Sequence, residues 1–324
     1  MSEQKKILNY NTLPEMFFKQ VKENSFKPLL WFKKNNKYCS LTWKNIENKI
    51  KKVSLEIKKI GLKNGDKVLI VSENNPNWFI ADFAIMASGC ITVPAYTTYT
   101  KKDFEYIIDD SEAKLAFISN QNLFNNFIQA AKNKKKLKNI ITFKKINYKK
   151  KKKKVIYVEE IYKSKNSSKF KINKKNKNDD ACIIYTSGTS GKPKGVVLTH
   201  KSIISNLIGS IDVFKSSPLK NERFISFLPL SHAYEHTAGQ FLPVAVAAQI
   251  FYAESLEKLF TNLKEVNPTI ISAVPRLYET IYKKILNNIL QKKTLIQKLF
   301  KINCELGKMK YENPKKYNLL HKIL

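Results

Sequence analysis

The sequence predicts an α/β fold in which mostly parallel sheets are layered with helices. Short apolar runs typical of buried strands alternate along the chain with segments whose apolar residues recur at helical spacing. Strands that alternate with helices are joined by crossovers, and such crossovers favour parallel pairing. The chain has 324 residues, 43% of them hydrophobic, which is enough for a substantial core of ordinary composition.

The first half of the chain supplies strands and helices in regular alternation. Trp43 begins the first predicted helix, in which apolar residues recur at steps of three and four until Gly61 ends the pattern. Asn64-Gly65 then predicts a turn before a buried strand. Asn75-Pro76 opens the second helix, because proline is favoured in the first helical turn. The predicted strands cover 68–71, 91–93, 114–118 and 140–143, and the predicted helices cover 43–60, 76–89 and 123–131.

The second half continues this alternation and then becomes helical. From Pro275 to the end the pattern is nearly all helical, with Asn313-Pro314 as a break. The predicted strands cover 181–185, 196–198, 223–227, 249–252 and 269–274, and the predicted helices cover 200–214, a stretch from about 231, and 255–266. We therefore expect three parts, namely a first α/β subdomain over 1–143, lysine-rich surface loops over 144–179, and a phosphate-loop subdomain with a helical end over 180–324.

One segment carries most of the functional information. Residues 185–200 read YTSGTSGKPKGVVLTH and hold three of the nine glycines, two lysines and, over 186–190, four serine and threonine hydroxyls. Glycine lets a backbone approach a ligand closely and point its amides inward, and lysines add positive charge. Pro193 stiffens the loop by fixing φ. This composition predicts a phosphate-binding loop, whose glycines are Gly188, Gly191 and Gly195.

Two other interpretations of this loop compete. A Walker-type phosphate loop requires glycine, four residues and then Gly-Lys-Ser/Thr, and this spacing is missing. A flexible Gly/Ser hairpin is the simple structural alternative, although hairpin loops are usually shorter. Within the loop, Thr186 could end a strand by bonding its own backbone, and Lys192 could be a solvated charge.

Residues 185–195, YTSGTSGKPKG, resemble the signature loop of the adenylate-forming, AMP-binding enzymes. Residues 227–235, FLPLSHAYE, are similar to a segment that lines the acyl pocket in the long-chain fatty acyl-CoA synthetase branch of that superfamily. Residues 272–279, SAVPRLYE, also look like that branch. Shorter matches follow the family's opening region at 41–43, 65–68 and 75–76. The resemblance covers nearly the whole chain and implies the large N-terminal domain of these enzymes.

The resemblance also implies roles for single residues. Lys194 would neutralise the phosphates of ATP, and Thr186 would place a hydroxyl close to a magnesium ion. His232 falls where the branch places an aromatic or imidazole group near the substrate carboxylate and the later thioester. Arg276 has at most a weak role and could instead pair with Glu279. The cradle for the β- and γ-phosphates would consist of Ser187, Gly188, Thr189, Ser190 and Gly191.

The implied activity is that of a long-chain fatty acid–CoA ligase, which is an acid–thiol ligase. A fatty acid would attack ATP to give an acyl-adenylate and pyrophosphate, and the thiol of CoA would then displace AMP. The expected partners are therefore a fatty acid, ATP with Mg²⁺, and CoA. Two alternatives stay open, namely a ligase for another carboxylate or for acyl carrier protein, and a non-catalytic nucleotide- or membrane-binding remnant of a split gene.

Several motifs of the family do not occur before Leu324. They are the adenine and ribose contacts, the magnesium-binding glutamate of a Tyr-Gly-x-Thr-Glu motif, the hinge, and the lysine of a small C-terminal domain. We therefore expect the chain to represent the N-terminal portion of such an enzyme, without the small domain, and to be inactive alone. A separately encoded C-terminal portion is then an expected partner.

The string HAYEH at 232–236 indicates a different enzyme class. It satisfies the H-x-x-E-H pattern of inverted zinc peptidases, whose two histidines share a metal one helical turn apart. Three specified positions make a weak motif, and the string lies inside the segment that the family resemblance already explains. We interpret His236 as a helix residue with an ordinary hydrogen-bond partner, and Tyr234 and Phe227 as core residues.

The formal net charge of +33 raises the question of a nucleic-acid partner. Only two of the 59 basic residues, Arg223 and Arg276, are arginine, whereas nucleic-acid readers depend on arginine for bidentate contacts. We therefore expect no specific nucleic-acid binding. Residues 149–154 are six consecutive lysines, which should repel one another into an open, solvated loop. The alternative for this run is peripheral contact with an anionic membrane.

The cysteines and the apolar runs bear on the compartment. The four cysteines are scattered without disulfide or metal spacing. No apolar run reaches the ~18 residues of a membrane span, and the first residues lack a secretory apolar region. A reduced cytoplasm is therefore the expected location.

Overall fold

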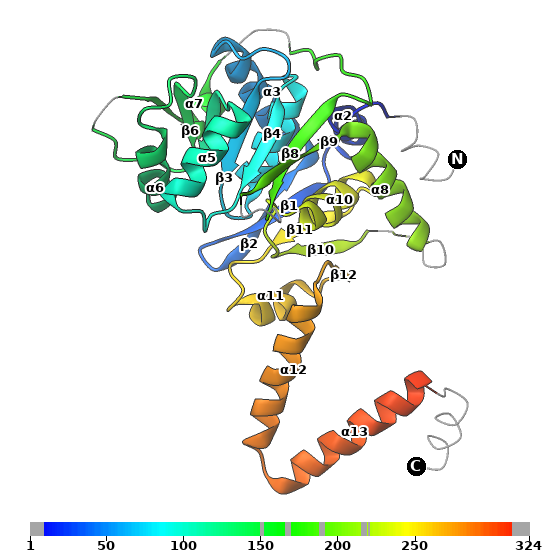
Figure 1. The fold of residues 1–324 in the computed structure, drawn as a ribbon. Coiled ribbons are helices and arrows are strands. Elements are labelled where there is room, and N and C mark those ends of the chain that lie inside the picture. The colour runs from blue at the N-terminus through cyan, green and yellow to red at the C-terminus, as the bar shows by residue number, and fades with distance from the viewer. Residues whose placement is uncertain are drawn as a thin grey trace. The chain divides into compact units, whose positions relative to one another are not determined.

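The strands gather into two sheets in the computed structural model, which describes residues 10–149, 152–165, 170–187, 192–214, 219 and 221–312 (Figure 1). The larger sheet contains β3 (Lys67–Val71), β4 (Ile91–Ala95), β5 (Leu115–Ile118), β6 (Asn139–Thr142), β7 (Lys154–Tyr157), β8 (Asp180–Thr186) and β9 (Lys194–Thr199). The smaller sheet contains β1 (Pro28–Lys34), β2 (Lys37–Thr42), β10 (Arg223–Ser226), β11 (Gln249–Tyr252) and β12 (Ile270–Ile271).

Both sheets are mostly parallel, which confirms the predicted α/β class. The larger sheet has the order β7-β6-β5-β3-β4-β8-β9, and within the described residues its one antiparallel pair is β8 with β9. The smaller sheet has the order β12-β10-β11-β1-β2, in which β1 and β2 form an antiparallel hairpin. The carboxyl ends of the parallel strands within each sheet therefore meet at one edge, where ligands of open α/β sheets usually bind.

The helices fill the layers around the sheets. They are α2 (Leu13–Asn24), α3 (Trp43–Lys59), α4 (Pro76–Ala87), α5 (Lys101–Ser111), α6 (Gln121–Ala131), α7 (Val158–Lys163), α8 (His200–Val213), α9 (Ala233–Glu235), the π-helix η1 (His236–Phe241), α10 (Leu242–Ala245), α11 (Leu259–Val266), α12 (Pro275–Leu290) and α13 (Thr294–Glu312).

Helix α4 lies between the two sheets. It contacts β3 and β4 of the larger sheet and β1 of the smaller one, and all of its residues except Asn77 are buried. A helix covered on both sides needs no polar stripe, which explains why its sequence is almost entirely apolar. The Asn75 side chain caps its start by accepting hydrogen bonds from the amides of Asn77 and Trp78.

The other face of the larger sheet is covered by α5 and α6, which pack against each other (Figure 1). Their apolar residues form a second buried cluster with that face, which includes Phe104, Ile107, Phe124 and Phe127. The central strands β3, β4 and β5 are therefore buried on both faces, as strands of parallel sheets generally are.

The chain-order division at 143 and 180 does not match the sheets. Strand β1 pairs in parallel with β11, with Leu30 opposite Ile250, so the smaller sheet joins two distant parts of the chain. Strands β8 and β9 extend the larger sheet beyond β4. Local patterns cannot report such long-range pairing, because they contain no information about which strands become neighbours.

We had expected residues 144–179 to be surface loops, but part of this stretch forms regular structure. They contain β7, which pairs with β6, and α7, which contacts α3. Lys153, within the run of lysines, is buried, and its ammonium donates to the carbonyl oxygens of Lys134 and Leu137 at 2.7 and 2.6 Å. Burial lowers the pKa of this lysine. Two other members of the run, residues 150 and 151, lie outside the described residues.

Some elements differ from the sequence prediction. The helix expected from about 231 is present, but its elements α9, η1 and α10, which follow one another without a gap, include the rare π geometry at the centre. The β1–β2 hairpin, α2 and α5 had no counterpart in the prediction. The hairpin turns at Asn35 and Asn36, whose φ values of 51° and 61° are those of a type I′ turn. The Asn-Asn pair was the signal that could have indicated it.

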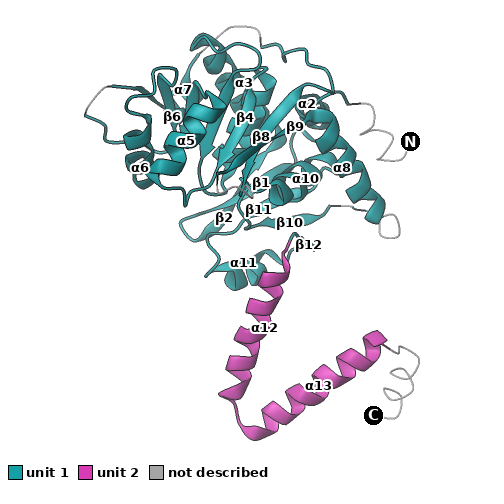
Figure 2. Cartoon of the chain, in the orientation of Figure 1, with its two compact units in different colours: residues 1–272 teal, residues 273–324 magenta. Residues whose placement is uncertain are grey.

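Residues 273–324 form a separate compact unit from residues 1–272 (Figure 2). Its described part consists of α12 and α13, and no side chain of either helix is buried. Within the described ranges, each helix of the chain is too short or too polar to cross a bilayer.

Candidate functional site

The phosphate loop predicted from the sequence joins β8 to β9. These strands pair so that Tyr185 lies opposite Gly195 and Thr186 lies opposite Lys194. The two ends of the loop are therefore adjacent, at the carboxyl end of β8, and the Thr186 and Lys194 side chains are both exposed. Directly opposite residues of an antiparallel pair point to the same face. The central residues Gly188, Thr189, Ser190 and Gly191 lie outside the described residues.

Gly195 is needed for packing within the hairpin. A Cβ atom at this position would lie 2.9 Å from Ile183 Cγ2 and 3.2 Å from Tyr185 Cζ. We had expected Gly195 to give the backbone access to a ligand, but its observed contacts are with the hairpin itself. The absent side chain lets the Tyr185 ring lie across the neighbouring strand.

Helix α5 holds both ends of the loop. The Tyr185 hydroxyl donates to Asp110 Oδ2 at 2.6 Å, and the Tyr106 hydroxyl donates to the carbonyl oxygen of Pro193 at 2.9 Å. The two tyrosine rings also meet edge to face, with centroids 6.5 Å apart. Burial, followed by the interaction with Asp110, raises the pKa of Tyr185, so this hydroxyl remains a donor at neutral pH. The helix thus fixes the base of the loop from both sides.

A cavity of about 410 Å³ brings the loop together with the second predicted segment. It is lined by Thr186 and Ser187 of the loop and by His232, three residues to which the sequence assigned functions. His232 lies in the connection between β10 and α9, so the chain after a strand of each sheet contributes to the cavity lining. The remaining lining residues are Tyr96, Tyr99, Ile184, Tyr185, Pro193 and Ala233.

His232 presents an exposed imidazole at this cavity. Its Nδ1 accepts a hydrogen bond from the amide of Tyr234 at 3.2 Å, which caps the short helix α9. An imidazole that accepts through Nδ1 carries its proton on Nε2 when neutral, so Nε2 is available as a donor. Tyr234 is 44% exposed, so its prediction as a core residue was wrong. Phe227 is partly buried.

Tyr96 and Tyr99 form an aromatic wall that the sequence analysis missed. They follow the carboxyl end of β4, and their rings meet edge to face with centroids 5.4 Å apart. Burial, with a smaller contribution from Tyr96 and Asp103, raises the pKa of Tyr99 to about 12. Both hydroxyls are therefore neutral near pH 7. Two tyrosines directly after a buried parallel strand were the signal that could have revealed them.

His236 has a structural environment that is separate from the cavity. Its imidazole is 1% exposed and lies 2.9 Å, Nε2 to Oδ2, from the buried Asp82 carboxylate. The rings of Trp78 and Phe241 contact it at centroid distances of 5.2 and 4.5 Å. The expectation of an ordinary hydrogen-bond partner is confirmed.

The zinc interpretation of the HAYEH string is wrong. His236 is buried against Asp82, whereas His232 is exposed at the cavity. Glu235 is also fully buried, and burial raises the pKa of its carboxyl to about 8 against the opposing hydrogen bond from Ser226. Across the described ranges, no group of three or more histidine, cysteine, aspartate or glutamate side chains is arranged to hold a metal ion.

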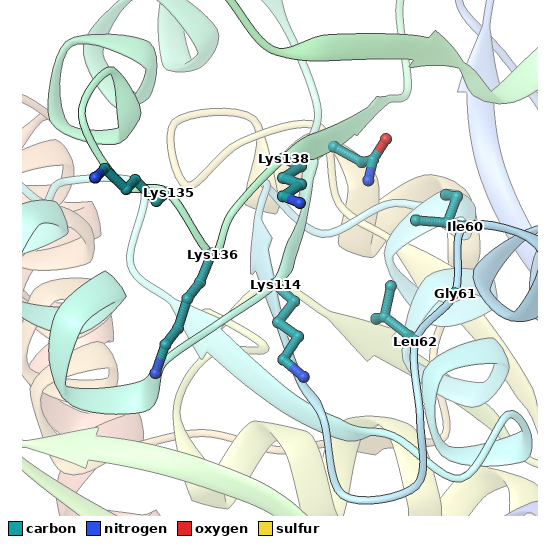
Figure 3. Close-up of a pocket in the computed structure, with 8 residues that line it drawn as sticks. Ile60, Gly61, Leu62, Lys114, Lys135, Lys136 and Lys138 are labelled. Atoms are coloured by element: carbon teal, nitrogen blue, oxygen red, sulfur yellow. The ribbon is translucent and has the colours of Figure 1, made fainter.

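A larger, basic cavity of about 470 Å³ lies at the amino ends of β5 and β6 (Figure 3). Its lysines are Lys114, Lys135, Lys136 and Lys138. Lys114 Nζ lies 2.6 Å from Asp66 Oδ1, and Lys136 pairs with Glu112, so carboxylates already neutralise part of the charge. Because this cavity contains none of the predicted site residues, we place the candidate site at the β8–β9 hairpin.

The sequence and fold define the class of the protein. Residues 17–310 match the AMP-binding enzyme family, so the chain belongs to this family. It is 30% identical over 290 residues to long chain acyl-CoA synthetase 3 of Arabidopsis thaliana. The alignment covers 85% of this chain and 44% of that protein. It is 29% identical over 298 residues to a long-chain-fatty-acid–CoA ligase of Gallus gallus, and this alignment covers 85% of the present chain and 37% of the Gallus gallus protein. The chain thus spans less than half the length of these curated relatives.

Solved structures agree with this fold. The adenylation domain of a carboxylate reductase from Mycobacterium chelonae superposes with a TM-score of 0.78 at 14% identity, over 91% of this chain and 51% of that one. A fatty acyl-adenylate ligase from L. pneumophila, solved with acyl adenylate and pyrophosphate, superposes with a TM-score of 0.65 at 19% identity. That superposition covers 83% of this chain and 45% of the ligase chain. At these identities the likeness concerns the fold alone.

Proposed function

We propose that this chain carries the phosphate-binding and carboxylate-binding parts of a long-chain fatty acid–CoA ligase, which activates its substrate with ATP through an acyl-adenylate. The observation that carries the proposal is the single cavity lined by Thr186, Ser187 and His232. These residues come from two sequence segments that each resemble the family, one at the end of β8 and one in the connection after β10. Two curated relatives named as acyl-CoA synthetase or ligase support the same class.

The loop would bind the triphosphate. Backbone amides and hydroxyls over 187–191 would donate to the β- and γ-phosphates, and Lys194 would offset their negative charge. The exposed Thr186 hydroxyl would be one ligand of Mg²⁺, with phosphate oxygens and water as the others, which suits the ligand preferences of this ion. When bound, Mg²⁺ would neutralise phosphate charge as a Lewis acid.

The first reaction requires positioning rather than a protein nucleophile. A carboxylate oxygen of the fatty acid would bond to the α-phosphorus of ATP as the bond to the leaving pyrophosphate breaks. Lys194 would stabilise the charge that builds on pyrophosphate. His232 would orient the carboxylate by donating from Nε2. In the second step the sulfur of CoA, after its thiol proton has passed to solvent, would bond to the acyl carbon as the bond from that carbon to the phosphate oxygen breaks and AMP leaves.

The aromatic wall favours one second candidate, a ligase for an aryl acid. Tyr96 and Tyr99 present ring surfaces to the cavity, and aromatic rings pack well against one another edge to face or offset. A panel of fatty and aryl acids separates the two candidates, because each predicts a different preferred substrate.

Trapping of the acyl-adenylate tests the proposal directly. Folded protein would be incubated with ATP, Mg²⁺, a long-chain fatty acid and hydroxylamine, which converts an acyl-adenylate to a hydroxamate. The chain would be assayed alone and with the C-terminal segment of the Arabidopsis thaliana relative supplied in trans. Formation of hydroxamate in either arrangement supports the proposal. If circular dichroism shows a folded chain and neither arrangement forms hydroxamate, the proposal is overturned for this polypeptide.

A further inference from the structure

The Asn74 side chain links the larger sheet to the loop that follows β10. Asn74 lies just after β3, and its Nδ2 donates to Ser226 Oγ at 2.9 Å and to the carbonyl oxygen of Leu228 at 2.7 Å. Its Oδ1 accepts from the amide of Leu230 at 3.1 Å. The side-chain amide of Asn74 therefore donates two hydrogen bonds and accepts one, and all three partners are about 150 positions away in the sequence.

The loop held by Asn74 ends at His232. The Pro229 carbonyl, between the two bonded residues Leu228 and Leu230, accepts from the amide of His232 at 2.9 Å. The His232 carbonyl then accepts from the amide of His236 at 2.9 Å, where the helical segment begins. The turn that carries the imidazole is thus bonded to Asn74 on one side and to the helix on the other.

A buried hydrogen bond extends this network beneath His232. Ser226 Oγ donates to Glu235 Oε1 at 2.7 Å, and it can do so while accepting from Asn74, because a hydroxyl both donates and accepts. Gly239 makes room for this carboxyl, since a Cβ there would lie 2.3 Å from Glu235 Oε1. Glu235 follows His232 by one helical turn, so the network holds the chain at both ends of that turn.

We propose that Asn74 is a positioning residue, which fixes the 228–232 loop and thereby places His232 beside Thr186 and Ser187. The inference rests on the proposed function, because it assumes that His232 acts on the substrate carboxylate. Asn74 itself does not line the cavity of Thr186 and His232 and acts through the backbone of the loop. An error of about 1 Å in the placement of a reacting group can cost about 100-fold in rate.

Two adjacent asparagines allow a matched test. Asn74→Asp keeps the acceptor for Leu230 but places an oxygen where Nδ2 donated, so it faces the Leu228 carbonyl with like polarity. Asn75→Asp makes the same chemical change one residue later. Asn75 caps α4 through its acceptor oxygen, and aspartate caps helices as well as asparagine does. The described bonds of Asn75 do not reach the 228–232 loop.

The first readout is the histidine spectrum of the whole chain, which does not depend on activity. The imidazole ¹H–¹³C signal of His232 is assigned by its disappearance in His232→Gln. We expect Asn74→Asp to shift this signal and Asn75→Asp to leave it unchanged. An unchanged His232 signal in Asn74→Asp would overturn the proposal. If Asn74→Asp does not fold, Asn74→Ala removes the same donors without adding the repulsion and is judged by the same criterion.

The second readout is the rate of hydroxamate formation. We expect Asn74→Asp to lower kcat about 10- to 100-fold, with KM for ATP within about 2-fold of the wild-type value, because the phosphate loop is untouched. Asn75→Asp should stay within about 2-fold in both. Equal losses in the two variants would indicate a general structural effect and overturn the proposal. If the wild-type chain forms no hydroxamate either alone or with the added C-terminal segment, the proposed function fails, while the histidine spectra still decide whether Asn74 places His232.

Discussion

The Tyr185 hydroxyl donates a 2.6 Å hydrogen bond to the Asp110 carboxylate, and this bond ties the end of β8 to helix α5. Tyr185 is 3% exposed, whereas Asp110 lies at the surface. The bond therefore holds the end of β8, at the base of the 185–195 loop, against helix α5.

Replacement of Tyr185 by phenylalanine should lower the free energy of unfolding by about 0.5–1.5 kcal/mol, the usual net value of one hydrogen bond. The loss stays in this range because water can solvate the exposed Asp110 carboxylate. Urea denaturation measures the change. Tyr106→Phe, which removes the bond to the Pro193 carbonyl, is the companion variant on the other side of the loop. Wild-type stability in both variants would show that α5 does not hold the loop.

Gly195→Ala should destabilise the protein by about 1–3 kcal/mol, because its methyl group would be forced against the Ile183 and Tyr185 side chains. Gly209→Ala is the matched control, since nothing lies within 4 Å of a Cβ at that helical position. Alanine there should stabilise the helix by about 0.5–1 kcal/mol. Thermal unfolding compares the two, and equal midpoints would contradict the packing role of Gly195.

Lys194→Ala should weaken the binding of pyrophosphate by about 10-fold or more, since a hydrogen bond to a charged group contributes about 1.5–3 kcal/mol. Lys192→Ala should change the affinity by less than about 2-fold, because we expect that side chain to be a solvated charge. Isothermal titration with pyrophosphate at two salt concentrations measures both, and the difference should shrink as salt screens the charge. A larger effect at Lys192 would reverse the assignment.

The buried Glu235 should make stability depend on pH. Its folded-state pKa of about 8 lies above the ordinary value of 4.5, so the folded protein holds a proton that the unfolded chain releases between these pH values. The stabilisation is complete below pH 4.5 and is lost as pH rises toward 8. Burial raises the pKa of Tyr252 well above its ordinary value, so this hydroxyl does not titrate in this window.

Glu235→Gln removes the titrating group but keeps its shape. The difference in unfolding free energy between wild type and this variant should fall as pH rises from 5 to 8, by at most about 1.4 kcal/mol per pH unit. Chemical denaturation across this pH range measures the difference. A constant difference would mean that the Glu235 carboxyl titrates normally.

The regular elements were predictable where a local pattern was complete. The apolar repeat after Trp43 and the cap at Asn75 predicted α3 and α4 within a few residues of their observed ends. The helix expected from about 231 is present over 233–245, but its central part, His236–Phe241, has π geometry. A periodicity of 3.6 residues cannot indicate a π-helix.

The sequence by itself determined the family, located the loop over 185–195 and singled out His232 as a candidate site residue, because these depend on short, contiguous strings. The tertiary structure alone decided that Thr186 and His232 line one cavity, that Asp82 engages His236, and that Asn74 holds the loop of His232. Each of these contacts joins residues far apart in the chain. Their partners are chosen by strand order and by the burial of polar groups, which require the whole fold and not its local segments.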